Sequence, residues 1–338
     1  MPEKIRIGVI GTASIAKKRM IPAILDSDKA EYVGVAIASS KEWDEPHTEE
    51  EYVSILENKK KKAEEFVELF GGKVFVGYED LLMSDEIDAV YIPLPPSMHY
   101  EWTKKALEYG KHVLAEKPFT IKECETVELV NISRSKDLAV SENYGFCLHP
   151  QLIEMKRILD SGEIGEYRLM RAMFTFPHRD ANDFRYSKKY GGGALLDAGG
   201  YVARAAELFL GDTIEVENSS LNYTEGHEVD MYGQTVFSNA DGAIAQVAFG
   251  MDNVYRCDIE VFGSIGSVKS DRAFTAPGDY EVVLKKQVGG EIQEISIAAV
   301  EQFKIVLERF CDAIGDGTVS EDVRKELCLH SKILEQMW

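Results

Sequence analysis

The stretch "GVIGTASIA", residues 8–16, decides the fold of this chain, because it joins an apolar strand to a helix through a turn of small residues. A dinucleotide-binding turn needs a residue that allows a tight bend, a small residue beneath the pyrophosphate and a small residue where helix and strand pack. Gly11, Ala13 and Ala16 occupy these positions, and Ala13 stands where a second glycine is usual. We therefore expect a pyrophosphate at the start of the helix, on the amides of Thr12, Ala13, Ser14 and Ile15. The alternative is a strand, turn and helix that bind no ligand.

Strands and helices alternate outward from this stretch through the first third of the chain. Apolar strands are predicted at residues 4–11, 30–39 and 111–118, and two more within residues 73–95. Helices are predicted at residues 14–27, 58–72 and 97–110. Such alternation is typical of a doubly wound parallel sheet, as in a Rossmann domain.

Residues 43–62 interrupt the alternation with a charged segment that is longer than an ordinary connection between a strand and a helix. We interpret this segment as a surface insertion, with room for one short helix. A solvated loop and a partner-binding loop are its two alternative roles.

The pattern changes after about residue 121. A linking helix is predicted at residues 122–137, and six strand-like segments follow between residues 167 and 287 before two closing helices. Consecutive strands separated by turn residues are typical of an antiparallel sheet. The predicted fold class is therefore α/β. A Rossmann domain at residues 1–122 precedes an α/β domain at residues 123–338, which holds an open, mostly antiparallel sheet.

Composition excludes several classes of function. The formal net charge of −20 over 338 residues repels nucleic acids and anionic membrane surfaces. No apolar run is long enough for a transmembrane helix, and no apolar signal core is present at the start, so we expect a cytoplasmic protein. The five cysteines have no metal-ligand spacing, which predicts buried thiols and no metal site: Cys124, Cys147, Cys257, Cys311 and Cys328.

The end of the second strand bears on the choice of cofactor. An NAD site usually has an acidic residue there, which binds the ribose hydroxyls. Ser39, Ser40 and Lys41 stand there instead, and two hydroxyls with one cation suit a 2′-phosphate. This pattern favours NADP(H). NAD(H) remains the alternative, with Asp44 as the residue that binds the ribose.

Three further motifs carry a resemblance to a known family. They are "GTASIAKKRMIPA", "YIPLPPSMHYEWTKKALEYGKHVLAEKPF" and "GGGALLDAGGYVARAAELFLG". Together with the closing "EQFKIVLERFCDAI", they resemble the Gfo/Idh/MocA oxidoreductase family over nearly the full length. The resemblance implies that Lys117, in the Glu-Lys-Pro triplet, lies near the nicotinamide and the reacting carbon. It also implies further residues on the cofactor side: Pro93, Leu94, His99, Glu116, Pro118, Asn143 and, toward the substrate, His149.

Tyr201 stands where many members of this family carry a histidine. In this respect the chain resembles the branch that holds nucleotide-diphosphosugar 3-ketoreductases. Reduction of a ketone creates negative charge on its oxygen, and a phenol can donate a proton to that oxygen. A nearby ammonium group lowers the pKa of a phenol and stabilises the developing charge. Tyr201 is thus the candidate acid, with Lys117 as its electrostatic partner.

The helix that carries Tyr201 contains further candidates. Asp197 lies four residues earlier, where it would orient the sugar hydroxyls or the lysine. Gly199 and Gly200 would allow cofactor or substrate to approach the helix, or would pack tightly against the sheet. The preceding loop adds cationic candidates for a sugar diphosphate, which could equally pair with carboxylates: His178, Arg179 and Arg185.

These residues together predict an NADP(H)-dependent oxidoreductase that acts on a ketone of a sugar, preferably a nucleotide-activated 3-ketosugar. The enzymatic alternative is a dehydrogenase of free sugars, cyclitols or diols. The alternative of another class is a non-catalytic sensor that binds the dinucleotide. The open sheet face predicts a homodimer or a homotetramer.

Overall fold

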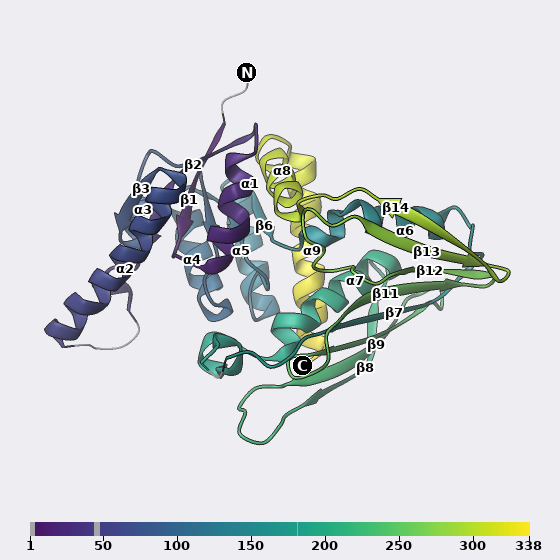
Figure 1. The fold of residues 1–338 in the computed structure, drawn as a ribbon. Helices are drawn as coiled ribbons and strands as arrows, with labels where there is room; N and C mark the ends of the chain where they lie inside the picture. The colour runs from purple at the N-terminus through teal and green to yellow at the C-terminus, as the bar shows by residue number, and fades with distance from the viewer. Residues whose placement is uncertain (1–3, 44–47, 181) are drawn as a thin grey trace. The chain divides into compact units, whose positions relative to one another are not determined.

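The computed structural model describes residues 4–43, 48–180 and 182–338 (Figure 1). The chain forms two compact units, neither of which is one continuous segment. The first unit comprises Met1–Thr120, Cys124–Asn143 and Val306–Leu327. The second comprises Ile121–Glu123, Tyr144–Ile305 and Cys328–Trp338. The division into functional domains at residue 122 stays a prediction.

A parallel sheet of six strands forms the centre of the first unit, in the order β3-β2-β1-β4-β5-β6. Its inner strands are apolar and buried because helices cover such sheets on both faces. All four residues of β4 are buried, for example. The doubly wound parallel sheet that the alternation predicts is confirmed. Its strands are β1 (Ile5–Ile10), β2 (Ala30–Ile37), β3 (Lys73–Val76), β4 (Ala89–Ile92), β5 (His112–Ala115) and β6 (Val140–Glu142).

Helices connect these strands, and the first of them begins with a π-helical turn, Ala16–Met20. The other helical segments of this unit are α1 (Ile21–Leu25), η2 (Ser40–Glu42), α2 (Glu49–Phe70), α3 (Tyr78–Leu82), α4 (Pro96–Glu108) and α5 (Glu123–Ser135). Two closing helices follow β14 (Glu291–Ile297) in sequence, α8 (Gln302–Gly315) and α9 (Gly317–Gln336), and their residues within Val306–Leu327 belong to the first unit.

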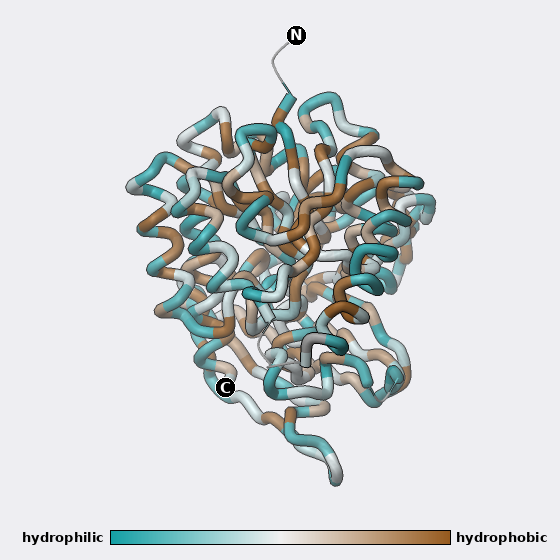
Figure 2. The backbone as a smooth tube through the Cα atoms, turned by 90° about the vertical axis from the view of Figure 1, so that its left-hand side faces the viewer, coloured by the Kyte–Doolittle hydropathy of each residue, from teal (hydrophilic) through white to brown (hydrophobic). Residues whose placement is uncertain are grey.

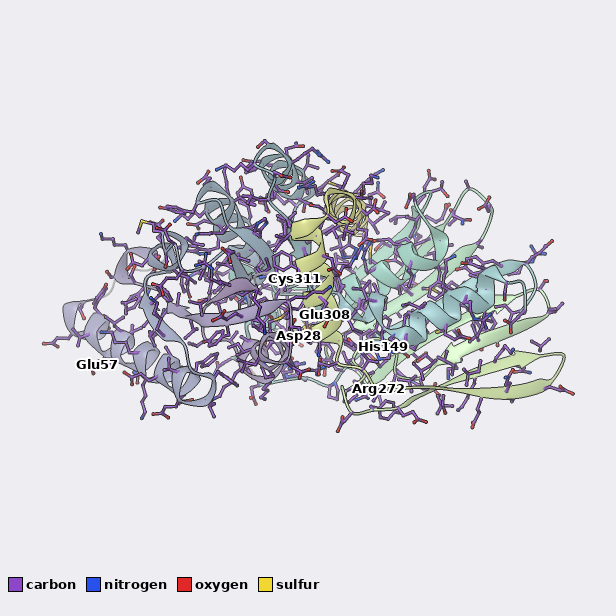
Figure 3. The ribbon with its side chains drawn as sticks, turned by 90° about the horizontal axis from the view of Figure 1, so that it is seen from above. Asp28, Glu57, His149, Arg272, Glu308 and Cys311 are labelled. Atoms are coloured by element: carbon purple, nitrogen blue, oxygen red, sulfur yellow. The ribbon has the colours of Figure 1, made fainter. Side chains whose placement is uncertain are left out.

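Helix α2 corrects one interpretation of the sequence. Most of residues 43–62 are not a loop with a short helix but the larger part of this 22-residue helix. Thr48 and Glu51 form a capping box that starts it: the Thr48 amide and hydroxyl donate to Glu51, and the Glu51 amide donates to the Thr48 hydroxyl. Figure 3 labels Glu57 on this helix. Asp44, the alternative ribose ligand, lies outside the described residues.

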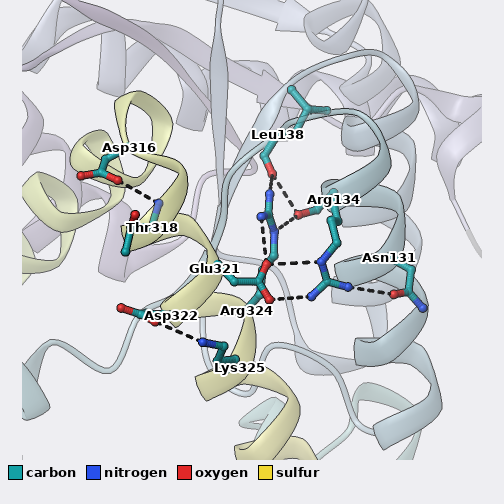
Figure 4. A network of polar contacts seen from close by, with 10 residues as sticks. Asn131, Arg134, Leu138, Asp316, Thr318, Glu321, Asp322, Arg324 and Lys325 are labelled. Atoms are coloured by element: carbon teal, nitrogen blue, oxygen red, sulfur yellow. Dashed lines mark hydrogen bonds and ion pairs between the residues drawn. The ribbon is translucent and has the colours of Figure 1, made fainter.

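Charged side chains join α5 to the first turns of α9 within the first unit (Figure 4). The guanidinium of Arg324 is buried, and it donates to the Ser133 hydroxyl at 2.9 Å and to the Leu138 carbonyl oxygen at 3.0 Å. Arg134 pairs with Glu321 at 2.9 Å nearby. Because the buried cation has several acceptors, its desolvation is offset by hydrogen bonds.

The second unit is built on an eight-stranded sheet in the order β14-β13-β12-β11-β7-β10-β9-β8. Only β7 and β10 pair in parallel among these described strands, so the sheet is mostly antiparallel, as predicted. The sequence did not predict β14, which follows β13 through a turn where Gly289 and Gly290 have positive φ. The strands are β7 (Tyr167–Thr175), β8 (Glu215–Asn222), β9 (Tyr232–Ser238), β10 (Ile244–Gly250), β11 (Arg256–Gly263), β12 (Gly266–Ser270), β13 (Val282–Val288) and β14 (Glu291–Ile297).

One face of this sheet holds the core of the second unit. Every second side chain of β9 and β10 is buried, with α7 packed against β7 and β10 and α6 against β11 and β12. In Figure 2, hydrophobic (brown) and hydrophilic (teal) stretches alternate along the backbone, and many of the outer turns are hydrophilic. The opposite face carries Leu169, Ile244 and Phe262 in register on three adjacent strands. The helical segments are η3 (Gly145–Leu148), α6 (Pro150–Asp160), η4 (Phe184–Tyr186), η5 (Lys188–Tyr190), η6 (Leu195–Gly199) and α7 (Gly200–Leu210).

Two general expectations concern the chain as a whole. Among the described residues, no helix combines the length and apolar character needed to cross a bilayer. The expectation of buried thiols holds for Cys257 and Cys311 but is wrong for Cys124, which is exposed.

Candidate active site

The first unit gathers its candidate residues at one edge of the parallel sheet. Gly11 follows β1, Ser39 follows β2, Leu94 follows β4, Lys117 follows β5 and Asn143 follows β6. The strand order reverses between β1 and β4, and open α/β sheets bind ligands at such a switch point, beyond the carboxyl ends of the strands. This edge therefore has the topology of a dinucleotide site.

Gly11 supplies the tight turn of this site. Its φ is +92°, which a side chain would strain, and an added Cβ would lie 3.1 Å from Leu94 Cδ2. Ser14 and Ile15 are exposed and Ala16 is fully buried, so the start of the helix is accessible while its base packs on the sheet. The helix then continues as a π turn, a feature that is frequent at functional sites.

The loop after β2 contains a carboxylate that the sequence did not single out. The Ser39 amide and hydroxyl both donate to Glu42 Oε2, at 2.6 and 2.9 Å, and the Glu79 amide donates to Oε1 at 2.9 Å. Glu42 therefore holds the shape of this loop. Ser40 is half-buried and Lys41 is exposed.

Glu116 and Asn143 are joined to each other. The side-chain Nδ2 of Asn143 donates to Glu116 Oε1 at 2.6 Å, and the Tyr91 hydroxyl donates to the same oxygen at 2.5 Å. Lys117, which follows Glu116, is half-buried, and the Lys117–Pro118 peptide bond is cis.

His99 lies behind this edge, fully buried. Its two ring nitrogens lie 2.7 Å from the carbonyl oxygens of Pro118 and Leu94. Burial lowers the pKa of His99, although the two carbonyl oxygens act in the opposite sense. The structure thus has His99 in contact with two loops of the candidate site; direct contact with a cofactor stays a prediction.

Tyr201 of the second unit lies in an aromatic shell. Its ring meets Phe174 at 4.9 Å and Tyr144 at 5.0 Å between centroids, both edge to face. Phe146 and Phe274 complete the shell at 5.5 and 6.0 Å. Because aromatic pairs prefer such geometries, the shell restricts how the Tyr201 ring can turn. None of these four neighbours was predicted, since they come from three separate segments of the chain.

Asp197 is paired with Arg185 in the second unit. Arg185 Nε donates to Asp197 Oδ2 at 2.6 Å, and Nη1 donates to Asp183 Oδ1 at 3.0 Å. Burial opposes the charged guanidinium, but Asp197 and Asp183 outweigh it and raise the pKa of Arg185. Of the two alternatives for Arg185, binding a sugar diphosphate or pairing with carboxylates, the structure shows the pairing with carboxylates. Its contact with a substrate diphosphate stays a prediction.

The segment that carries Asp197 is a π turn, η6, and not a regular α-helix. A Cβ added to Gly199 would lie 3.0 Å from Leu195 Cδ1 and 3.3 Å from two Phe249 ring carbons. A Cβ on Gly200 would lie 2.1 Å from the Tyr144 hydroxyl oxygen. Gly199 therefore packs closely against Phe249 of the sheet, as the second of the two alternatives has it, whereas Gly200 packs against Tyr144, which is not part of the sheet.

A buried ionic group lies deeper along α7. Glu207 accepts from Arg204 Nη1 at 2.7 Å and lies 2.6 Å from His330 Nδ1. Burial alone would raise the pKa of Glu207, but His330 and Arg204 lower it instead. The His330 ring meets Tyr144 edge to face at 5.1 Å, and so supports the ring that contacts Tyr201. No local sequence signal indicates this group.

His149 caps the start of α6 (Figure 3). Its Nδ1 accepts from the Gln151 amide at 3.2 Å, and burial lowers its pKa. Its Nε2 is buried without a hydrogen-bond partner among the described residues. A buried N–H group without a partner indicates a place for a water or a ligand acceptor.

His178 and Arg179 lie in the loop after β7. The Arg179 guanidinium lies over the Phe176 ring at 4.9 Å, and the His178 ring stacks on Tyr186 at 4.4 Å. Both side chains are exposed, and their roles in substrate binding stay predictions.

Comparison with known proteins accounts for both units. Residues 5–144 match an oxidoreductase family with an NAD-binding Rossmann fold, and residues 152–269 match the Gfo/Idh/MocA C-terminal domain. The chain belongs to the Gfo/Idh/MocA oxidoreductase family. The resemblance that the motifs carry is thereby confirmed, and members of this family are oxidoreductases.

Several Gfo/Idh/MocA relatives match nearly the whole chain. A dTDP-3,4-didehydro-2,6-dideoxy-alpha-D-glucose 3-reductase of Saccharopolyspora spinosa is 38% identical over 322 residues, 95% of this chain and 91% of that protein. A D-xylose 1-dehydrogenase (NADP(+)) of Haloferax volcanii is 29% identical over 321 residues, 94% and 92% of the two chains.

A solved 3-ketoreductase from Actinomadura kijaniata, in complex with NADP and TDP-benzene, has a TM-score of 0.88 at 35% identity. The match covers 98% of this chain and 96% of that chain. Variants of it with one tyrosine replaced by phenylalanine and with one lysine replaced by alanine have also been solved, both with TDP-benzene and NADP.

Proposed function

We propose that this protein uses NADPH to reduce the 3-keto group of a dTDP-activated deoxysugar. One observation carries the proposal: 38% identity over 95% of the chain to a reductase of that specificity. The solved 3-ketoreductase in complex with NADP and TDP-benzene supports the same substrate class.

The first unit has features that fit the cofactor. Gly11, with a φ of +92°, allows the tight turn after β1, and the accessible helix start beside it offers amides for a pyrophosphate. Lys41 is the residue proposed to attract the 2′-phosphate, assisted by Ser39 and Ser40. When bound, NADPH supplies the hydride for the reaction.

Tyr201 is the proposed proton donor to the ketone oxygen, and Lys117 the cation that stabilises the developing charge. The lysine and the tyrosine replaced in the Actinomadura 3-ketoreductase stand as far apart in that chain as Lys117 and Tyr201 do in this one. The aromatic shell restricts the Tyr201 ring, so the hydroxyl is held in one direction. Asp197 is proposed to assist by orienting the substrate.

A dehydrogenase of free sugars is the second candidate, because the Haloferax xylose dehydrogenase is also similar over nearly the full length. Assays with each substrate distinguish the two candidate functions. With NADPH and dTDP-3,4-didehydro-2,6-dideoxyglucose, the protein should oxidise NADPH, so the absorbance of NADPH should fall. With NADP⁺ and D-xylose, no NADPH absorbance should appear. The opposite pair of results would replace the proposed substrate by a free sugar.

The sheet of the second unit is proposed as the contact of a homodimer. Leu169, Ile244 and Phe262 form an apolar row on the face opposite the helices, and Ile244 is 40% exposed. Exposed apolar faces of sheets are common interfaces. Light scattering at micromolar concentration should give a dimer or tetramer that Ile244→Glu dissociates; a monomeric wild-type protein would contradict this.

A further inference from the structure

Two histidines of the second unit lie close together, edge to face, although they are 49 residues apart in the sequence. His178 lies in the loop after β7, and His227 lies in the connection between β8 and β9. Their Nε2 atoms are 3.5 Å apart. This separation is longer than the ordinary range for a nitrogen donor, about 2.7–3.2 Å, so no good hydrogen bond joins the two rings.

The other nitrogen of each ring faces a fixed oxygen. His178 Nδ1 lies 2.6 Å from the Arg179 carbonyl oxygen, which can only accept, so Nδ1 carries the proton and Nε2 keeps its lone pair. His227 Nδ1 lies 3.1 Å from the Thr224 hydroxyl, which can accept in the same way. Histidines that bind metal ions usually donate a hydrogen bond from the opposite ring nitrogen to an acceptor of the protein.

Tyr186 fixes the geometry of both rings. The His178 ring stacks on it with an interplanar angle of 5°, and the His227 ring meets it at 64° with centroids 5.6 Å apart. The Arg179 amide donates to the Tyr186 hydroxyl at 2.7 Å, which ties the same loop to this ring. The two Nε2 atoms are therefore held near each other before any ligand binds.

The separation of the two nitrogens fits one kind of ion. Histidine nitrogens bind Zn²⁺ at about 2.0–2.1 Å with tetrahedral geometry, which places two such nitrogens about 3.3–3.4 Å apart. We propose that His178 and His227 together bind one Zn²⁺ ion, with water in the remaining positions. No group of three acidic, histidine or cysteine ligands occurs among the described residues, so the proposed site has two protein ligands.

The proposed ion would join two loops near the start of the helix that carries Tyr201. Arg185 precedes Tyr186 in the chain and pairs with Asp197, four residues before Tyr201. Zinc at His178 would thus restrain the loop that holds this ion pair. The inference is independent of the proposed reaction, and it departs from the sequence-based prediction of no metal site, which considered only spacing along the chain.

Zinc titration of protein without a histidine tag tests the proposal, with uptake followed by a competing chromophoric indicator. The wild-type protein and the control His47→Asn should take up one Zn²⁺ per chain at micromolar concentration. His178→Asn and His227→Asn should each lose this uptake. Equal uptake by the wild type and both of these variants, or no uptake by the wild type, would overturn the proposal.

Thermal unfolding provides a second readout. Zinc should raise the unfolding temperature of the wild type and of His47→Asn, because a ligand that binds only the folded state stabilises it. The rise should be absent in the two variants of the pair, whose melting without zinc shows whether they are folded. For any variant that does not fold, cobalt(II) bound to the wild type should show the absorption of a tetrahedral site, and octahedral absorption alone would refute the zinc geometry.

Discussion

Gly200→Ala should disturb the candidate active site through a single contact. The added Cβ would lie 2.1 Å from the Tyr144 hydroxyl oxygen, a distance that Cβ contacts do not show, so the Tyr144 ring has to shift. That ring meets Tyr201 at 5.0 Å, and its displacement should turn the proposed proton donor. We expect lower turnover by a protein that still binds NADPH.

The size of the effect follows from two opposing contributions. Overpacking of a core costs about 1–3 kcal/mol, whereas replacing a helical glycine by alanine gains about 1 kcal/mol. The net loss of unfolding free energy should be about 0–2 kcal/mol. In a Tyr144→Phe background the hydroxyl is absent, and the nearest atom becomes the ring carbon Cζ at 3.3 Å. There the same alanine should be neutral or stabilising.

Urea unfolding and turnover of the four proteins in this cycle measure the coupling between the two positions. Gly199→Ala serves as the matched control, because its Cβ meets the end of a flexible leucine at 3.0 Å and not Tyr144. Its effect should not depend on the Tyr144 hydroxyl. If the costs of Gly200→Ala and Tyr144→Phe simply add, the contact does not control Tyr201 and the reasoning is wrong.

Three more predictions concern other residues of the two units. Glu207→Gln should cost about 3–5 kcal/mol of unfolding free energy, because it breaks a buried ionic group. The pKa of Glu207 is lowered in the folded state, so this difference should persist above the unfolded pKa of about 4.3 and shrink as the pH falls through the folded pKa. Urea titrations at several pH values would show this dependence. Arg185→Lys should lower kcat more than NADPH affinity, because lysine cannot bind Asp183 and Asp197 together, and steady-state kinetics with a separate NADPH titration tests this. Lys41→Ala should weaken NADPH relative to NADH by about 1–3 kcal/mol in calorimetry, and an unchanged ratio would remove Lys41 from the cofactor site.

The framework of both units could be predicted because its signals are local. Apolar runs alternating with helical patterns indicated the strands of the first unit, and Gly289 with Gly290 indicated a turn of the second. Helix α2 was predicted only from residue 58, because its first turns are charged and its capping box, Thr48 with Glu51, was not considered. Strand β14 was missed because most of its side chains are exposed and it lacks an apolar run.

The candidate site was predicted less completely because its contacts join distant segments. Lys117 and Tyr201 stand in motifs that can be read along the chain. The Arg185–Asp197 pair, the shell around Tyr201 and the Glu207–His330 pair depend on how loops and strands meet in the folded unit. Gly199 packs against the sheet, as one of the two sequence interpretations has it, but the contact of Gly200 with Tyr144 could not be predicted because Tyr144 lies in a distant segment.

Single-turnover hydride transfer to the dTDP-3-ketosugar, followed by NADPH absorbance, tests the central claim most directly. Tyr201→Phe keeps the ring and removes only the proton, so the rate should fall by about 10²–10⁴-fold with little change in NADPH affinity. Lys117→Ala should be at least as severe, and the double variant should lose far less than the product of the two losses. A near-wild-type rate for Tyr201→Phe would contradict the claim and make His178 or a bound water the next candidate acid.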